Sequence, residues 1–246
     1  MEALLITRDD VVKFTSLNGN VDPDKFIQYV KIAQDLHIQS YLGTDLFEKI
    51  KTDIILASSG IPTLISITNA GTGYSTSTGN TTTASVGTGT GLTLDITDTG
   101  GLVTVADIDT AGTGYKVNDV SIIDGGNDDA EITIDEIFTI PTNYNNLLNT
   151  YIKPMLIHWA MVEYLPYSAY TIGNKGVYKH SAESSENIDR LELSLLIDKQ
   201  TQTANHYSTR FVDFMCFNQA LFPEYNSNSN GDIYPNSNTN FTNWVL

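Results

Sequence analysis

The most apolar run of the chain is Leu147–Pro166, with the sequence LLNTYIKPMLIHWAMVEYLP. Its large apolar residues recur every three or four positions, the spacing of one face of an α-helix: Leu148, Ile152, Met155, Trp159 and Val162. Lys153 and Glu163 would need partners in lipid, so the run predicts the central helix of a soluble domain rather than a membrane span. Pro154 lacks a backbone N–H, which predicts either a kink there or a helix that begins near it.

Shorter helices are predicted before residue 60. Thr7 and Asp10 have the spacing of an N-terminal cap with an acid in the first turn. In the next helix we expect Gln34 to face water and an apolar stripe to be buried, made of Phe26, Ile27, Val30, Ile32, Ala33 and Leu36. Gly43 is placed for a left-handed C-terminal cap, and Thr44 for the N-terminal cap of a third helix.

From Ile65 the periodicity changes from helical to alternating, and Gly, Thr and Ser become abundant, which is typical of strands and turns. The segment Ile67–Tyr74, ITNAGTGY, returns 41 residues later as Ile108–Tyr115, IDTAGTGY. Leu92–Ile96 similarly returns 40 residues later as Ile132–Glu136. We therefore expect two copies of one hairpin-like unit in a small sandwich or barrel. In each copy the glycines supply positive φ and the tyrosine packs back on the sheet.

Helical periodicity returns after Pro141. A cap at Ser184 or Ser185 is predicted to start a last long helix, whose buried stripe comprises Ile188, Leu191, Leu195, Leu196, Phe211, Phe214, Met215, Ala220 and Leu221. Residues 225–246 are rich in Asn and Ser, yet they carry more large apolar groups than an unstructured tail needs. We expect an extended arm that lies on another surface, a neighbouring subunit being one candidate. Its interface residues are Tyr225, Ile233, Tyr234, Phe241, Trp244, Val245 and Leu246.

These patterns together predict an α+β fold. It consists of a helical bundle of about four helices, an inserted small antiparallel β domain and an extended C-terminal arm. The helical domain is expected to be discontinuous, formed by residues 1–60 and 141–224. Residues 61–140 form the insert, and residues 225–246 form the arm.

The formal net charge is −16 and the isoelectric point is near 4.3, which argues against a protein that grips nucleic acid through a basic surface. Residues 61–140 carry eleven acidic residues and one basic residue, so −10 of this charge lies in the predicted insert. Cys216 is the single cysteine, so no internal disulfide is possible. The first ten residues are too acidic for a signal peptide, and we expect synthesis in a cytoplasm.

Catalytic signatures are weak. His158 and Glu163 are five positions apart on the predicted central helix, whereas two ligands on one helical face need three or four. His37, His180 and His206 lie far apart in the sequence, and none has a cysteine or acidic residue at the spacing of a metal-binding motif. A structural protein is therefore favoured over an enzyme, with no cofactor expected.

Two motifs in the insert resemble ligand loops. Gly87, Gly89 and Gly91 are followed by a strand pattern rather than by the helix that a phosphate loop needs, which favours a turn. A dense acidic cluster raises the alternative of a calcium loop, although it lacks the EF-hand order and a solvated acidic turn is favoured: Asp124, Asp128, Asp129 and Glu131.

Three segments carry a resemblance to a known family: AQDLHIQSYLGTDLFEKI at Ala33–Ile50, YIKPMLIHWAMVEYLP at Tyr151–Pro166, and FNQALFPEY at Phe217–Tyr225. They resemble the head-to-tail connector (adaptor) proteins of tailed bacteriophages. The Ala-Gly-Thr-Gly-Tyr repeats resemble β modules on virion proteins of phages that infect Bacteroidetes and of the crAss-like group.

The resemblance implies a virion structural protein of the neck region that forms a homo-oligomeric ring, commonly a dodecamer. Its partners would be the portal protein and tail or further ring proteins. DNA would pass through the lumen without specific binding, which suits a negative protein because like charges repel. No membrane partner is expected. The alternative is a virion-mounted module whose β insert binds a glycan or host surface.

Overall fold

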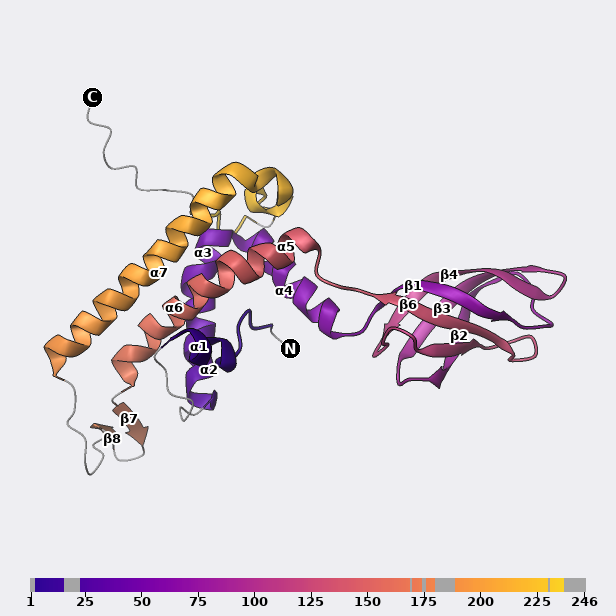
Figure 1. Ribbon diagram of the computed structural model, residues 1–246, viewed down its shortest axis with the longest axis horizontal. Coiled ribbons are helices and arrows are strands. Elements are labelled where there is room, and N and C mark those ends of the chain that lie inside the picture. The colour runs from indigo at the N-terminus through magenta and orange to yellow at the C-terminus, as the bar shows by residue number, and fades with distance from the viewer. Residues whose placement is uncertain are drawn as a thin grey trace. The chain divides into compact units, whose positions relative to one another are not determined.

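A computed structural model describes residues 3–15, 23–168, 170–173, 176–179, 189–229 and 231–236. It combines helices with antiparallel strands, so the chain has the predicted α+β class (Figure 1). Two compact units are present. Met1–Lys51 and Pro141–Leu246 form one, here called the helical unit, and Thr52–Ile140 form the other, here called the β unit. Among the described residues, no helix has both the length and the apolar character to cross a bilayer.

The helical segments are, in order, α1 (Arg8–Phe14), α2 (Pro23–Ala33), α3 (Gln39–Leu42), α4 (Thr44–Ser58), α5 (Thr142–Leu147), α6 (Lys153–Tyr164) and α7 (Arg190–Asn218). The described residues also contain two π-helical turns, η1 (Gln34–Ile38) and η2 (Leu148–Ile152), and three 3₁₀ turns, η3 (Leu165–Tyr167) after α6 and η4 (Gln219–Leu221) and η5 (Pro223–Asn226) after α7. β7 (Tyr170–Gly173) and β8 (Gly176–Lys179) pair as a hairpin.

Helix α6 is the centre of the helical unit, because α2 and α7 both pack on it (Figure 1). Its buried residues are Met155, Leu156, Ile157, Trp159, Ala160 and Met161. Pro154 is the second residue of α6, but α5, η2 and α6 follow one another without a gap and have helical φ and ψ at both junctions. The helix therefore begins at Thr142 rather than near Pro154, and the π turn η2 stands directly before the proline.

The N-terminal helices agree with the sequence in part. Thr7 and Asp10 form the predicted capping box of α1. Phe26, Val30 and Ala33 are buried as expected, whereas the other members of the predicted stripe are exposed: Ile27, Ile32 and Leu36. Gln34 was expected to face water and is fully buried. The π turn η1 adds a residue to the helical repeat, which rotates the buried face after Ala33.

Helix α7 also departs from its prediction. Asp189 is its N-cap, in a capping box with Glu192, whereas the predicted caps Ser184 and Ser185 and the first predicted stripe residue, Ile188, lie outside the described residues. The expected stripe is buried at Phe211 and Met215, whereas its first leucines, Leu191, Leu195 and Leu196, are exposed. The contacts of α7 with α6 and η2 lie further along the helix, at Gln200, Ser208 and Phe214, whereas these leucines belong to its first two turns.

The β unit contains six strands: β1 (Pro62–Ala70), β2 (Ser77–Val86), β3 (Thr90–Thr99), β4 (Leu102–Thr113), β5 (Val120–Ile123) and β6 (Ala130–Ile137). All pair antiparallel in the order β1-β6-β5-β2-β3-β4. The first sequence repeat comprises β1, β2 and β3, and the second comprises β4, β5 and β6. Exchanging each strand for its counterpart in the other repeat gives the same strand order, read from the opposite edge. The first strand of each repeat pairs with the last strand of the other, so the repeats complete one another rather than folding as separate hairpin units.

The sheet curls so that its edge strands β1 and β4 lie against each other around one apolar core. Tyr74 and Tyr115, the last residues of the two AGTGY segments, are both buried in it. The glycines of both segments have positive φ, as predicted. Gly89 lies against the ring of Tyr115, and β3 follows at Thr90, which confirms a strand-connecting turn in place of a phosphate loop.

The start of the first strand and the end of the last strand of this sheet lie side by side. Pro62 of β1 is the register partner of Ile137 of β6. The Phe138 N–H donates to the Ile61 carbonyl at 2.7 Å. A segment that leaves and returns at adjacent points can be inserted between two parts of a domain with little loop-closure cost.

Candidate functional site

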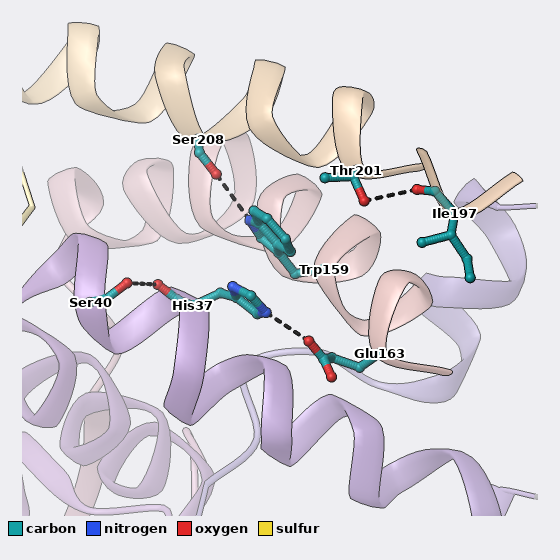
Figure 2. A network of polar contacts seen from close by, with 7 residues as sticks. All are labelled: His37, Ser40, Trp159, Glu163, Ile197, Thr201 and Ser208. Atoms are coloured by element: carbon teal, nitrogen blue, oxygen red, sulfur yellow. Dashed lines mark hydrogen bonds and ion pairs between the residues drawn. The ribbon is translucent and has the colours of Figure 1, made fainter. Parts of the chain in front are cut away.

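A chain of polar contacts crosses the helical unit at Trp159 (Figure 2). The Trp159 indole Nε1 donates to Ser208 Oγ on α7 at 3.0 Å. On its other side the indole stacks on His37 of η1, with ring centroids 3.8 Å apart and planes 9° apart. His37 Nε2 lies 2.9 Å from Glu163 Oε1, one turn along α6 from Trp159. The contacts tie η1, α6 and α7 together.

The position of His37 follows from the π turn, because η1 directs its ring towards α6. The side chains of His37 and Glu163 are 24% and 27% exposed. Their hydrogen bond and the stack on Trp159 fix the imidazole in one orientation, so its role in this arrangement is to hold helices together. Sequence reasoning missed the pair, since 126 positions separate the two residues and neither spacing nor motif links them.

A second arrangement surrounds a cavity of about 450 Å³ between α1, the start of α6 and α7. Its lining includes Phe14, Lys153, His158, Tyr207 and Arg210. Gln200 on α7 and His158 Nδ1 are 2.6 Å apart, and the His158 ring stacks on Tyr207 with centroids 5.1 Å apart. Burial lowers the pKa of His158 below its usual value, so the imidazole favours its neutral form.

Three of the four calcium candidates accept hydrogen bonds from separate partners. Asp124 accepts hydrogen bonds from the hydroxyls of Thr81 and Thr83. Asp128 accepts from the Gly125 N–H, Asp129 from the N–H and hydroxyl of Thr72, and Glu131 lies in β6. Hydrogen bonds from Thr72 lower the pKa of Asp129. No group of three or more His, Cys, Asp or Glu side chains suited to a metal ion is found in the described part of the chain.

The interface candidates of the predicted arm separate into three groups. Tyr225 is buried, packs edge-on against Phe211, and has its pKa raised to about 12 by burial, so it belongs to the core of the chain itself. Ile233 and Tyr234 are exposed, at 40% and 65%. The other four, Phe241, Trp244, Val245 and Leu246, lie outside the described residues.

The beginning of the predicted arm lies on its own chain. The Thr44 N–H donates to the Ile233 carbonyl at 3.0 Å, and the Asn236 N–H donates to the Ser40 carbonyl at 2.8 Å. Gly43 has a positive φ of 75°, but its ψ of 159° lies outside the left-handed helical region of the predicted cap, and a Cβ there would lie 2.8 Å from Pro235 Cδ. Residues 233–236 are therefore seated on the α3–α4 corner, which requires glycine at position 43.

The same corner explains two further differences from the sequence. Thr44 was expected to cap α4, but it is the first helical residue, and its hydroxyl accepts from the Ile233 N–H at 3.3 Å. Asp45 accepts from the hydroxyl of Ser227 and from the N–H and hydroxyl of Ser229. These hydrogen bonds, that of Ser227 first, lower the pKa of Asp45.

Comparison with known proteins adds one match. Residues 126–235 match the family described as "Family of unknown function (DUF6712)". The match covers less than half of the chain and runs from the β5–β6 connection through α6 and α7 to Pro235. No curated protein matches the chain, and no solved structure does.

Proposed function

We propose that this protein is a virion structural protein of a tailed bacteriophage, a subunit of the head-to-tail adaptor ring that joins the portal to the tail around the DNA channel. In this proposal α1, α2, α6 and α7 act as the bundle of about four helices, and the neck of the virion is its location. The proposal rests first on the similarity of the three helical segments to connector proteins.

The structural observation that carries the proposal is a pair of exposed apolar stripes in the helical unit. Leu191, Leu195 and Leu196 on α7 are 74%, 68% and 50% exposed. Ile32 on α2 and Leu36 in η1, four positions apart, form the second stripe and are 39% and 61% exposed, and Ile27 is a further exposed residue of α2 at 50%. Exposed apolar patches of this kind mark interaction surfaces.

The two stripes lie on helices that pack on α6, and α6 runs between α2 and α7 in Figure 1. A ring needs a head-to-tail interface, in which two different patches of one subunit meet the complementary patches of its two neighbours. Apolar stripes on two separate helices meet that requirement. A twofold dimer would need only one such stripe, because the same patch of each subunit meets its copy. The ring would commonly be twelvefold to match the portal.

The net charge of −16 is consistent with a channel through which DNA slides. Binding a duplex takes basic side chains on the phosphates, whereas a surface of the same sign as the duplex repels it. Portal and tail proteins would be the remaining partners, and residues 237–246 would supply part of the contact with them.

The glycan-binding alternative gains no support from the β unit. Tyr74 and Tyr115, whose rings could stack on a sugar, are buried. Surface hydroxyls and carboxylates are engaged with each other across strands, as with Thr93 on Asp109 and Ser66 on Asp135. We therefore do not propose a surface-binding function for the β unit.

The proposal is tested by the mass of the purified protein in solution and by electron microscopy. The unmodified chain should form closed rings, and Leu195→Asp should shift it to monomers because it places a charge in an apolar interface. Val105→Asp, at a residue of β4 that is 45% exposed, is the matched control and should leave the rings intact. A protein that is monomeric at every concentration, and absent from virions by mass spectrometry, would contradict the proposal.

A further inference from the structure

The cavity between α1, α6 and α7 combines apolar walls with two cationic side chains. Phe14, Pro154, Ile157 and Tyr207 line it with flat or branched apolar surface. A volume of about 450 Å³ lies within the range of pockets that hold small organic ligands. Phe14 is 66% exposed, so a ligand seated here would cover an aromatic ring that the chain itself leaves in contact with water.

Lys153 and Arg210 bring two positive charges to this cavity in a chain with 13 basic and 29 acidic residues. Arg210 lies over the ring of Tyr151, 5.0 Å from its centroid, which restricts the guanidinium. The structure shows no hydrogen bond or ion pair between Lys153 and another described residue. Asp10, which also lines the cavity, uses Oδ2 to accept from the N–H and hydroxyl of Thr7 in the α1 capping box.

His158 adds a neutral donor. The Gln200 amide is a donor to Nδ1, so the neutral ring carries its proton on Nε2. The ring is parallel to that of Tyr207, with 8° between the planes, which extends the flat wall of the cavity. The polar side chains on the cavity also include Asn149, whose amide donates to the carbonyl and side-chain oxygens of Asn145, and the carboxylate of Asp10 is already engaged in a helix cap.

We propose that this cavity binds a small aromatic carboxylate. Its carboxylate would lie against Lys153 and Arg210, and its ring would lie among Phe14, Ile157 and Tyr207. Charge-assisted hydrogen bonds select the anion, and burial of the ring supplies the apolar part of the affinity. The inference rests on the cavity alone and is independent of ring assembly.

Isothermal titration of the full chain with indole-3-acetate, and with its neutral analogue indole-3-acetamide, tests the proposal. The two probes have nearly the same shape and differ in charge. Indole-3-acetate should bind at least about tenfold more tightly than the amide, because hydrogen bonds to a charged group are stronger than neutral ones. Equal affinities, or no binding of either probe at millimolar concentration, would overturn the proposal.

Variants locate the site. The double variant Lys153→Gln with Arg210→Gln should weaken binding of indole-3-acetate at least about tenfold and leave binding of the amide within about twofold. Arg190→Gln with Lys199→Gln removes the same two charge types from exposed positions on α7 and should leave both affinities unchanged. Unchanged binding of indole-3-acetate in the first double variant would place the site elsewhere and refute the assignment.

A third variant tests the apolar half of the site. Phe14→Ala should weaken both probes by a similar factor, since it removes an aromatic wall and no charge. Because Phe14 is exposed, the variant is expected to fold, and its thermal unfolding midpoint checks this. A loss confined to indole-3-acetate would contradict the placement of the ring.

Discussion

Replacing Tyr74 and Tyr115 by phenylalanine, one at a time, compares equivalent positions of the two repeats in the β unit. Both tyrosines are buried. The Tyr74 hydroxyl donates to the Ile123 carbonyl at 2.8 Å and accepts from the Ala130 N–H at 3.1 Å. The Tyr115 hydroxyl is buried without a hydrogen-bond partner. The same chemical change is therefore expected to have opposite effects.

The magnitudes follow from these contacts. Tyr74→Phe leaves a buried N–H and a buried carbonyl each without one partner, which costs about 1–3 kcal/mol of the free energy of unfolding. Tyr115→Phe removes a buried hydroxyl that has no hydrogen-bond partner. The free energy of unfolding should therefore stay the same or rise by up to about 2 kcal/mol. Neither change alters the ring, so packing contributes little to the difference.

Hydrogen exchange measured by mass spectrometry on the full chain gives the opening free energy of the β unit separately from that of the helical unit. In Tyr74→Phe, peptides that contain β3 and β6 should exchange faster than in the parent protein. In Tyr115→Phe, the same peptides should exchange at the parent rate or more slowly. Equal destabilisation by both changes would refute the reasoning, because it would mean that the two hydroxyls have equivalent surroundings.

Three further changes test the helical unit. Gly43→Ala should lower the free energy of unfolding by about 1–3 kcal/mol, through a strained φ and a clash with Pro235; an unchanged urea midpoint would contradict this. Trp159→Phe should lower the free energy of unfolding by about 1–3 kcal/mol, because it loses the hydrogen bond to Ser208 and part of the stacking on His37. An unchanged free energy of unfolding would contradict a role of the indole in holding the helices together. Burial depresses the pKa of His158, so the unfolded chain protonates first and stability should fall as the pH drops through about 6.5. His158→Gln should flatten this decline in the thermal midpoint; the same slope in the variant and the parent would contradict the burial effect.

Local chemistry made several features predictable. The capping box at Thr7 and Asp10, the positive φ of Gly43 and the burial of Tyr74 and Tyr115 each follow from a residue type and its immediate neighbours. The repeats likewise predicted a β insert. They could not predict that the first strand of each copy pairs with the last strand of the other, because strand pairing depends on contacts distant in sequence.

The failures share one cause, which is a dependence on tertiary packing. Gln34 is polar and was placed in water, yet η1 turns it inward, where its amide accepts from the Leu5 N–H and donates to the Ala3 carbonyl. Leu191 and Leu195 have helical spacing but are exposed, and no sequence pattern shows that α7 contacts α6 further along, at Gln200 and Ser208. Periodicity defines which residues share a face, but not whether another element covers it.

The candidate sites were the least predictable part. His37 and Glu163 meet only because the π turn η1 packs against α6. Lys153 and Arg210 come from different helices, and neither belongs to a sequence motif. Sites built from isolated residues on separate helices give no signal in local spacing.

The most direct test of the proposed function is the mass of the purified, full-length protein across a range of concentrations, combined with electron microscopy of the same sample. The account predicts closed rings whose mass is a multiple, commonly twelvefold, of the 27.0 kDa chain, and the same protein at the neck of purified virions. A monomer at every concentration that is missing from the particles would contradict it.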